Sequence, residues 1–171
     1  MSSDAALTIE SLTIEPLARD HDRAGFCCGV ESLDRYLKHQ AGQDVKRRIS
    51  RVFVVRRSEE KTKVLGYYTL STLSIDLSML PESIAKTLPR HPIPAALIGR
   101  LAVDKTAKGQ GVGKMLVANA IRRTLAVSNE IAIYAMVVDA INEQAASFYR
   151  QYGFTPLAER GSRLFLPLKA L

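Results

Sequence analysis

The sequence has no tryptophan, only two cysteines and no long apolar run. Cys27 and Cys28 are adjacent, so an ordinary disulfide between them is geometrically unfavourable. Neither belongs to a Cys-x-x-Cys pair or a Cys/His cluster, and the sequence therefore predicts no metal site. The longest apolar run, Ile131 to Val138, has eight residues, far fewer than the roughly 18 that a membrane-spanning helix needs. These absences argue against a disulfide scaffold, a metalloprotein and a membrane-spanning protein.

The length and composition are those of a single domain. A chain of 171 residues that is 47% apolar can bury a sizeable core, and a typical domain has about 100–200 residues. The sequence has no repeat, low-complexity segment or second domain, so we predict one domain over residues 1–171. The first six residues lack the basic patch and the apolar stretch of a secretory signal, and we therefore expect a cytoplasmic protein.

Positive charge is concentrated in one part of the chain. The sequence has 24 Lys and Arg against 17 Asp and Glu, for a net charge of +7. The segment from Arg35 to Lys63 has ten basic and three acidic residues, and the rest of the chain is balanced. Such a segment indicates a polyanionic partner, or else a solvated face without a partner.

The spacing of apolar residues predicts an α/β fold. Four prolines between residues 78 and 94 favour a short helix and a loop there. Helical spacing predicts helices over residues 30–43, 114–127 and 142–152, the last ending at Gly153. β-Branched and aromatic runs predict strands over residues 8–17, 51–56, 64–70, 95–103, 131–138 and 163–168.

A glycine-rich loop, residues 108–113, lies between a predicted strand and a predicted helix. At a helix N-terminus, unpaired backbone amides and the helix dipole favour an anion, and glycines allow close approach and unusual dihedral angles. The loop does not match G-x-x-x-x-G-K-[ST], and it fails G-x-G-x-x-G because Leu116 stands in the place of the last glycine. The loop is therefore either a structural turn or a site for a different phosphate ligand.

Three segments resemble the GNAT N-acetyltransferases. Lys108-Gly109-Gln110-Gly111-Val112-Gly113 resembles the Q/R-x-x-G-x-G/A pyrophosphate loop of that family, with lysine in the first place. Arg100 to Asp104 resembles its splayed strand, and Asn142 to Phe154 resembles its N-x-x-A-x-x-F-Y-x-x-x-G-F signature. The resemblance implies an α/β (α+β) fold with a single GNAT-like domain. Its sheet would be mixed, mostly antiparallel and twisted, with about six or seven strands flanked by helices. A splayed central strand would hold acetyl-CoA.

The resemblance also assigns residues to acetyl-CoA, the acetyl donor, and implies no metal. The backbone of the splayed strand is expected to pair with the pantetheine arm, and the loop amides are expected to bind the pyrophosphate. Asn142 resembles a family residue that helps to hold the cofactor, although a helix N-cap is an equal alternative. The implied cofactor-binding residues are Leu101, Val103, Lys108, Gly109, Gln110, Gly111, Val112, Gly113, Lys114 and Asn142.

Tyr149 is the candidate catalytic residue, because it stands where the family usually has a tyrosine that protonates the departing thiolate. A phenol with an ordinary pKa of about 10 is protonated at neutral pH and can donate its proton. The alternative is that Tyr149 only packs its ring in the core, as Phe148 is expected to do.

The sequence offers no side chain as a general base. Ala95 to Val103 contains no Asp, Glu or His, whereas many GNAT enzymes that act on lysine have a carboxylate on this strand or its neighbour. A lysine amine has a pKa of about 10.4, but a free α-amine has a pKa of about 7.7–8.0 and is partly neutral at pH 7. The missing carboxylate favours an α-amine as the acetyl acceptor.

The amino-terminal half resembles the GNAT toxins of bacterial type II toxin–antitoxin modules, through Phe26 to Leu37, Gln43-Asp44 and the basic Arg47 to Val54. Those toxins acetylate the α-amine of the amino acid on charged tRNA and stop translation, and a ribbon-helix-helix antitoxin neutralises them. The resemblance implies aminoacyl-tRNA and such an antitoxin as partners, and a homodimer. The expected RNA-binding residues are Lys46, Arg47, Arg48 and Arg51.

Two other functions stay open from the sequence. One is an ordinary GNAT acetyltransferase acting on a small-molecule amine or a protein N-terminus, and the other is a non-catalytic acetyl-CoA-binding module. His91 could relay a proton but is more simply a surface histidine. Arg100 is expected to meet substrate or phosphate, or to form a structural ion pair. Cys27 and Cys28 are expected to be buried, inert thiols.

Overall fold

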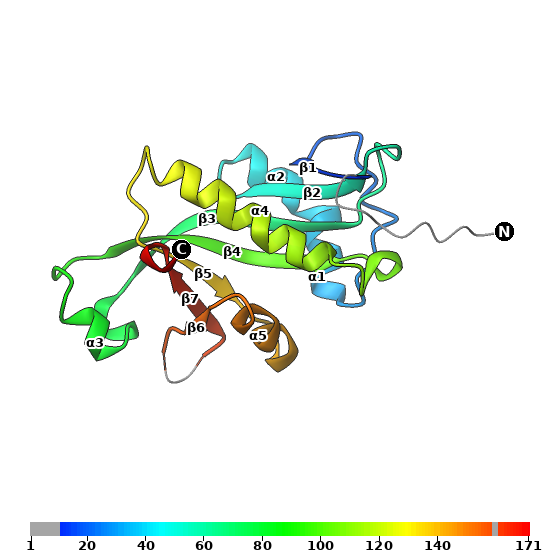
Figure 1. Cartoon of the computed structure of the whole chain (residues 1–171). Coiled ribbons are helices and arrows are strands. Elements are labelled where there is room, and N and C mark those ends of the chain that lie inside the picture. Colours follow the sequence, from blue (N-terminus) through cyan, green and yellow to red (C-terminus); the bar gives the residue numbers. More distant parts are fainter. Residues whose placement is uncertain (1–10, 159–160) are drawn as a thin grey trace. The chain divides into compact units, whose positions relative to one another are not determined.

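The computed structural model describes residues 11–158 and 161–171. The chain divides into two units, one formed by Met1–Thr69 with Arg100–Ala120 and the other by Leu70–Gly99 with Ile121–Leu171. Three elements run through both units, namely strands β3 (Gly66–Ile75) and β4 (Ile93–Val103) and helix α4 (Val112–Val127) (Figure 1).

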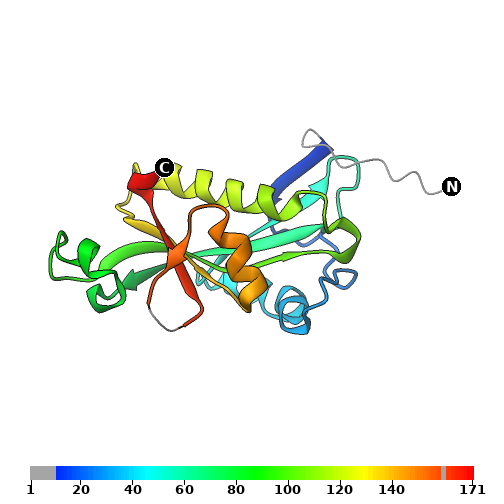
Figure 2. The same ribbon diagram turned by 60° about the horizontal axis from the view of Figure 1, so that its bottom comes forward.

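The first unit has its strands in the order β1-β2-β3-β4. Strand β1 (Leu12–Pro16) pairs antiparallel with β2 (Arg51–Arg57), and Pro16 lies opposite Phe53. Helix α1 (Glu31–His39) lies on one side of these strands and the first part of α4 on the other (Figures 1 and 2). Because both faces are covered, Val52 to Val55 are all buried.

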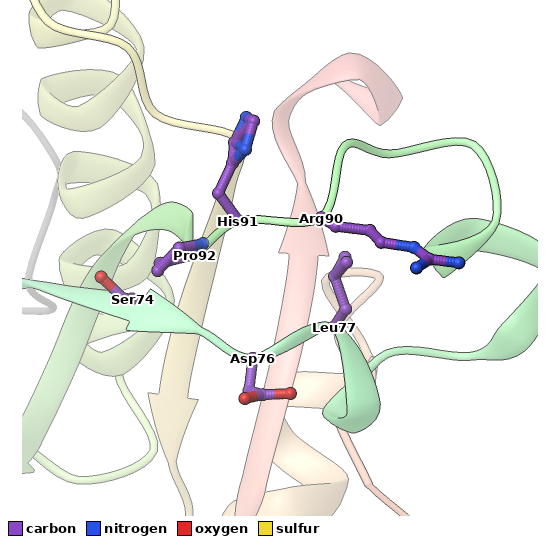
Figure 3. Close-up of a pocket in the computed structure, with 6 residues that line it drawn as sticks. All are labelled: Ser74, Asp76, Leu77, Arg90, His91 and Pro92. Carbon is purple, nitrogen blue, oxygen red and sulfur yellow. The ribbon is translucent and has the colours of Figure 1, made fainter.

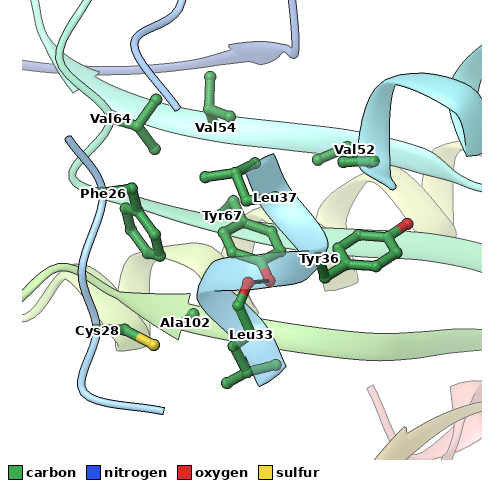
Figure 4. Packing of buried hydrophobic residues seen from close by; sticks show 11 residues of the cluster. Phe26, Cys28, Leu33, Tyr36, Leu37, Val52, Val54, Val64, Tyr67 and Ala102 are labelled. Atoms are coloured by element: carbon green, nitrogen blue, oxygen red, sulfur yellow. Dashed lines mark hydrogen bonds between the residues drawn. The ribbon is translucent and has the colours of Figure 1, made fainter. Parts of the chain in front are cut away.

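Helix α1 is held by its apolar stripe. Leu33, Tyr36 and Leu37 recur at helical spacing and are buried in one cluster with Tyr67 of β3 and Phe26 (Figure 4). Burying one such side chain contributes about 1.5–3 kcal/mol. The opposite face of the helix is polar, so the predicted amphipathic helix is confirmed over these residues.

The predicted helix over residues 30–43 is in fact two helices. Gln40 leaves the helical conformation, with φ −123° and ψ −34°, and α2 (Ala41–Lys46) follows it. Gly42 weakens a continuous helix at this point, and the bend leaves Ala41 fully buried. The bend sends the last turn of α2 and the basic residues after it in a new direction.

The second unit has its strands in the order β3-β4-β5-β7-β6. Strand β4 pairs in parallel with β5 (Ala135–Asp139), and β7 (Arg163–Pro167) pairs antiparallel with both β5 and β6 (Thr155–Pro156). Helices α3 (Glu82–Ala85) and α5 (Glu143–Arg150) complete it. Figure 2 shows the chain leaving β5 into α5 and returning through β6 and β7.

The predicted strand over residues 131–138 begins later than expected. The first residue of the run, Ile131, is 66% exposed, and the structure places residues 131–134 before β5. Residues 135–138 are fully buried, as expected for a strand covered on both faces. An apolar run alone does not distinguish a strand from the loop that leads into it.

Other observed boundaries of helices and strands also differ from the predicted ones. Strand β3 extends to Ile75, α4 begins at Val112 instead of residue 114, and the two-residue β6 was not predicted. Thr8 to Glu10 of the first predicted strand lie outside the described residues.

The predicted fold class is confirmed. The described residues form seven strands in one mixed sheet, with five α-helices. None of the helices in this part of the chain is long and apolar enough to cross a membrane. Residues 11–158 and 161–171 also contain no cluster of three or more His, Cys, Asp or Glu that would suit a metal ion.

Candidate functional site

The glycine loop joins β4 to α4 in the first unit. A short 3-10 helix (Lys105–Ala107) follows β4, and the loop then turns through Gly109 with φ +76° and Gly111 with φ +82°. These values lie in the left-handed region that favours glycine. A Cβ built on either glycine would meet no atom within 4 Å, so the space beside the loop is open.

The first turn of α4 offers backbone amides to an anion. The Met115 amide donates to the Gly111 carbonyl (3.1 Å), and the amides of residues 112–114 have no acceptor within the helix. Val112 is 1% exposed, so it contributes its amide alone, whereas the exposed Lys114 adds a cation. Amides, open space and the dipole of a 16-residue helix fit a pyrophosphate.

Strand β4 continues beyond its pairing with β5. Within the described residues that pairing ends where Ile98 lies opposite Val138, and β4 runs on to Val103. Leu101 and Val103 are half-buried, with the buried Ala102 between them. A strand edge without a neighbour presents backbone donors and acceptors to an extended ligand, which is what the predicted splayed strand requires.

Tyr149 lies on α5 in the second unit. The side chain is 4% exposed, and its ring makes edge-to-face contacts with Phe148 (5.3 Å between centroids) and Phe154 (5.8 Å). Burial raises the pKa of the Tyr149 phenol well above its usual value, and the Asp139 carboxylate raises it further. The phenol is therefore a protonated donor at neutral pH. The structure confirms that the Tyr149 ring packs in the core. The catalytic role of Tyr149 stays a prediction.

Asn142 caps helix α5. Its Oδ1 accepts a hydrogen bond from the Ala145 amide (2.8 Å), which satisfies one of the orphan amides of the first turn. The helix ends before Gly153, whose φ is +94°. The N-cap alternative is confirmed, and the cofactor contact of Asn142 stays a prediction.

The predicted RNA-binding residues lie together where α2 ends and β2 begins. We call residues 46–51 the basic turn, and its four cationic side chains, Lys46, Arg47, Arg48 and Arg51, are all exposed. The Ile49 amide donates to the Asp44 carbonyl (2.9 Å) and the Arg48 amide to the Val45 carbonyl (3.1 Å). This pair of bonds is a Schellman motif, the usual C-terminal cap of a helix.

Arg48 occupies the position of that motif at which glycine is usual. Its φ of +61° is left-handed, and Arg48 is the one non-glycine residue with a positive φ in the described part of the chain. A side chain at this position costs about 1–2 kcal/mol relative to glycine. An arginine in this strained position is a candidate for a functional role, and its RNA contact stays a prediction.

Residues 48–156 match the family described as acetyltransferase (GNAT) domain. The chain belongs to the GNAT family of acetyltransferases. Two curated relatives were found among bacterial toxins. One is the probable toxin TacT of Sinorhizobium fredii, 32% identical over 167 residues and 92% of each chain. The other is a tRNA-acetylating toxin of Mycobacterium tuberculosis, 33% identical over 133 residues and 78% of each chain.

Solved structures of AtaT resemble more than nine-tenths of the chain. AtaT complexed with acetyl-methionyl-tRNAfMet has a TM-score of 0.86 and 36% identity, over 93% of this chain and 96% of that one. A tyrosine-to-phenylalanine mutant of the AtaT toxin, bound to the C-terminus of the antitoxin AtaR and acetyl-CoA, has a TM-score of 0.80 and 34% identity. The matched parts are 94% and 95% of the two chains.

The first residue of the GNAT loop, Lys108, departs from the usual Gln or Arg. Its Nζ donates a hydrogen bond to the Cys28 carbonyl (2.6 Å), so in this structure its ammonium holds the segment before α1. The loop amides remain available to a phosphate. Gly113 lies within α4 without a positive φ, and the expectation of an unusual backbone at this third glycine is wrong.

Asp104, which sequence reasoning did not single out, organises the start of the GNAT loop. It is 5% exposed, and it accepts hydrogen bonds from the Cys27 amide (2.9 Å) and from the amide and hydroxyl of Thr106 (3.1 and 2.6 Å). Burial alone would raise the pKa of this carboxyl, but the hydrogen bonds from Thr106 and Cys27 bring it below its usual value. The aspartate followed two residues later by threonine was the available signal.

The two cysteines differ in exposure. Cys28 is 3% exposed, and burial, with Asp34 beside it, raises the pKa of its thiol to about 11, which confirms an inert thiol. Cys27 is exposed, so the expectation that both are buried is wrong. The reason is that adjacent residues in an extended segment point to opposite sides.

Arg100 forms no ion pair within residues 11–158 and 161–171, and its contact with substrate or phosphate stays a prediction. Its guanidinium carbon lies 3.7 Å from the centroid of the Tyr36 ring, a cation–π contact. The Tyr36 hydroxyl in turn donates to Asp44 Oδ2 (2.8 Å). Sequence reasoning did not find this link, because residues 36, 44 and 100 share no motif.

His91 lines a surface pocket of the second unit with Ser74, Asp76, Leu77, Arg90 and Pro92. The side chains of His91, Arg90 and Asp76 point in different directions (Figure 3). Asp76 accepts hydrogen bonds from the amide and hydroxyl of Ser78 (2.8 and 2.7 Å), which lower the pKa of its carboxyl. The polar side chains of this pocket do not point toward a common centre. His91 is an exposed surface histidine.

The predicted site residues thus fall into two groups. The first unit contains the glycine loop, the end of β4 and the basic turn, and the second contains Tyr149 and Asn142.

Proposed function

We propose that this chain transfers the acetyl group of acetyl-CoA to the α-amine of the amino acid on charged tRNA, and so blocks translation. The observation that carries the proposal is a single unit that holds a loop fitting a pyrophosphate and an exposed basic turn. Membership of the GNAT family and similarity to toxins, one of them a tRNA-acetylating toxin, support it.

Acetyl-CoA supplies an acetyl group activated as a thioester. The amides of residues 111–114 would bind its pyrophosphate, with Lys114 adding charge. The β4 backbone at Leu101 and Val103 would pair with the pantetheine arm, and an N–H near Val103 would polarise the thioester carbonyl. Lys108 would support this site through the bond from its Nζ to Cys28.

Two protons move during the transfer. The amine nitrogen bonds to the carbonyl carbon as the carbon–sulfur bond breaks, so the amine loses a proton and the departing thiolate gains one. Tyr149 would donate the second proton from its phenol, which its raised pKa keeps protonated. Strand β4 has no Asp, Glu or His, so water would take the first proton, which suits an α-amine with a pKa of about 7.7–8.0.

The proposal includes partners. AtaT has been solved with the C-terminus of the antitoxin AtaR, and we expect a ribbon-helix-helix antitoxin to neutralise this chain. Charged tRNA as substrate places the reaction in the cytoplasm. One domain, residues 1–171, would carry the activity, as a homodimer.

A labelling experiment tests this function. The protein is incubated with labelled acetyl-CoA and total aminoacyl-tRNA, and the aminoacyl ends that carry label are identified. We expect label on aminoacyl ends, none on uncharged tRNA, and little with the Tyr149→Phe variant. A strong preference for lysine peptides or for a polyamine over charged tRNA, in side-by-side assays, would indicate an ordinary GNAT acetyltransferase instead.

A further inference from the structure

We propose that Tyr36, with Asp44 and Arg100, is a positioning residue that holds the basic turn in its RNA-binding conformation and ties it to the end of β4. The inference rests on the proposed function. None of the three residues belongs to the basic turn, and Tyr36 is 3% exposed, so Tyr36 would act through Arg47 and Arg48 instead of touching the RNA.

The first step of the link joins α1 to α2. The Tyr36 hydroxyl donates to Asp44 Oδ2 (2.8 Å) across the bend at Gln40. Burial and then Asp44 raise the pKa of Tyr36 to about 12, and the Ser50 side chain acts in the opposite direction. The hydroxyl is therefore protonated at any working pH and can donate to Asp44.

The second step runs from Asp44 into the basic turn. The Asp44 carbonyl accepts the amides of Ile49 (2.9 Å) and Ser50 (3.4 Å), which close the turn that carries Arg47 and Arg48. Because Arg48 has a left-handed φ of +61°, the turn is not the conformation that this sequence prefers by itself. An outside contact that fixes Asp44 would therefore shift the turn toward the observed conformation.

The third step joins the link to β4. The Arg100 guanidinium lies over the Tyr36 ring, 3.7 Å from its centroid. The backbone amide of Arg100 donates a hydrogen bond to Thr69 Oγ1 (3.0 Å). Arg100 immediately precedes Leu101, whose backbone is expected to pair with acetyl-CoA. Tyr36 thus contacts Asp44, whose carbonyl closes the basic turn, and Arg100, which precedes the backbone assigned to acetyl-CoA.

The test uses two matched tyrosines of the same cluster. Tyr36→Phe removes the hydrogen bond to Asp44 and keeps the ring that stacks near Tyr67 (6.3 Å between centroids). Tyr67→Phe, the control, removes a buried hydroxyl that donates to the Leu33 carbonyl (2.6 Å). Both substitutions delete one hydroxyl from the core, and only the first touches the link.

We expect Tyr36→Phe to raise KM for charged tRNA on the order of tenfold, as for loss of one hydrogen bond to a charged group. KM for acetyl-CoA and kcat should stay unchanged, and Tyr67→Phe should leave all three parameters as in the unmodified protein. Arg100→Met should raise KM for charged tRNA in the same direction. Identical kinetics for the two tyrosine variants would overturn the proposal.

A second measurement does not depend on the substrate. Hydrogen exchange at the amides of Ile49 and Ser50 should be faster in Tyr36→Phe than in Tyr67→Phe. Equal exchange would refute the link even if charged tRNA is the substrate. Failure of the unmodified protein to acetylate any charged tRNA would instead refute the proposed function, and faster exchange would then still support the link.

Discussion

Gly66 has no room for a side chain, because backbone and side-chain atoms surround it closely. A Cβ at this position would lie 2.9 Å from the Ala102 carbonyl oxygen, 3.1 Å from Leu116 Cδ1 and 3.2 Å from Val55 Cγ1. Since one of these atoms belongs to the backbone, β3 and β4 would have to separate, and overpacking of this kind costs about 1–3 kcal/mol. We expect Gly66→Ala to lower the free energy of unfolding by that amount in urea titrations.

The matched control for that prediction is Gly42→Ala. Its Cβ would meet Arg23 Nη1 at 2.8 Å, which is the end of a flexible side chain, and alanine favours the helix. We expect unchanged or slightly higher stability. An equal loss of stability in both variants would contradict the packing argument.

Tyr149 is the residue whose chemistry is easiest to separate from its packing. We expect Tyr149→Phe to bind acetyl-CoA as the unmodified protein does and to lose most of its turnover, because phenylalanine keeps the ring contacts and removes the proton donor. Unchanged turnover of the purified variant would remove Tyr149 from the mechanism.

The pH profile provides a second check on Tyr149. Its phenol acts as an acid in the protonated form, and its pKa is raised above the usual value by burial and Asp139. Turnover should therefore rise until the acceptor amine is neutral, at about pH 8, and should not fall between about pH 8 and 10. A decline centred near pH 8 in single-turnover assays would contradict this assignment.

At the scale of elements, the end of α2 is the informative one. Arg47, Arg48 and Arg51 are exposed on the basic turn, and phosphate contacts confer affinity that depends steeply on salt. Replacing all three by alanine should raise KM for charged tRNA and reduce the salt slope by about one per lost contact. Acetyl-CoA binding should not change, since the loop uses backbone amides. Identical kinetics would show that the cluster has no role.

Elements also show where sequence reasoning succeeds. The glycine loop was located from its glycines between a predicted strand and a predicted helix, because close approach needs glycine at particular places. The signature around Tyr149 was located from its resemblance to the GNAT family. The ends of the helices and strands were predicted less accurately. The bend at Gln40 and the late start of β5 depend on which residues are buried, and burial is decided by elements distant in sequence.

At the scale of the whole molecule, the excess charge has a location. The segment 35–63, which carries it, lies entirely in the first unit. That unit also contains the glycine loop, and under the proposed function it would bind two anionic ligands in different ways. Side-chain charge would bind the RNA, and backbone amides would bind the pyrophosphate.

The sequence by itself predicted the fold class from periodicity, the family from its resemblance to GNAT motifs, and the candidate site residues, because periodicity and motifs are local properties. Only the tertiary structure decided what Lys108 and Arg100 do and that Asp104 also binds the segment before α1, since the partners are Cys28, Tyr36 and Cys27. These partners lie more than 60 residues away in the chain. A contact across that distance depends on how helices and strands pack, and no local pattern encodes it.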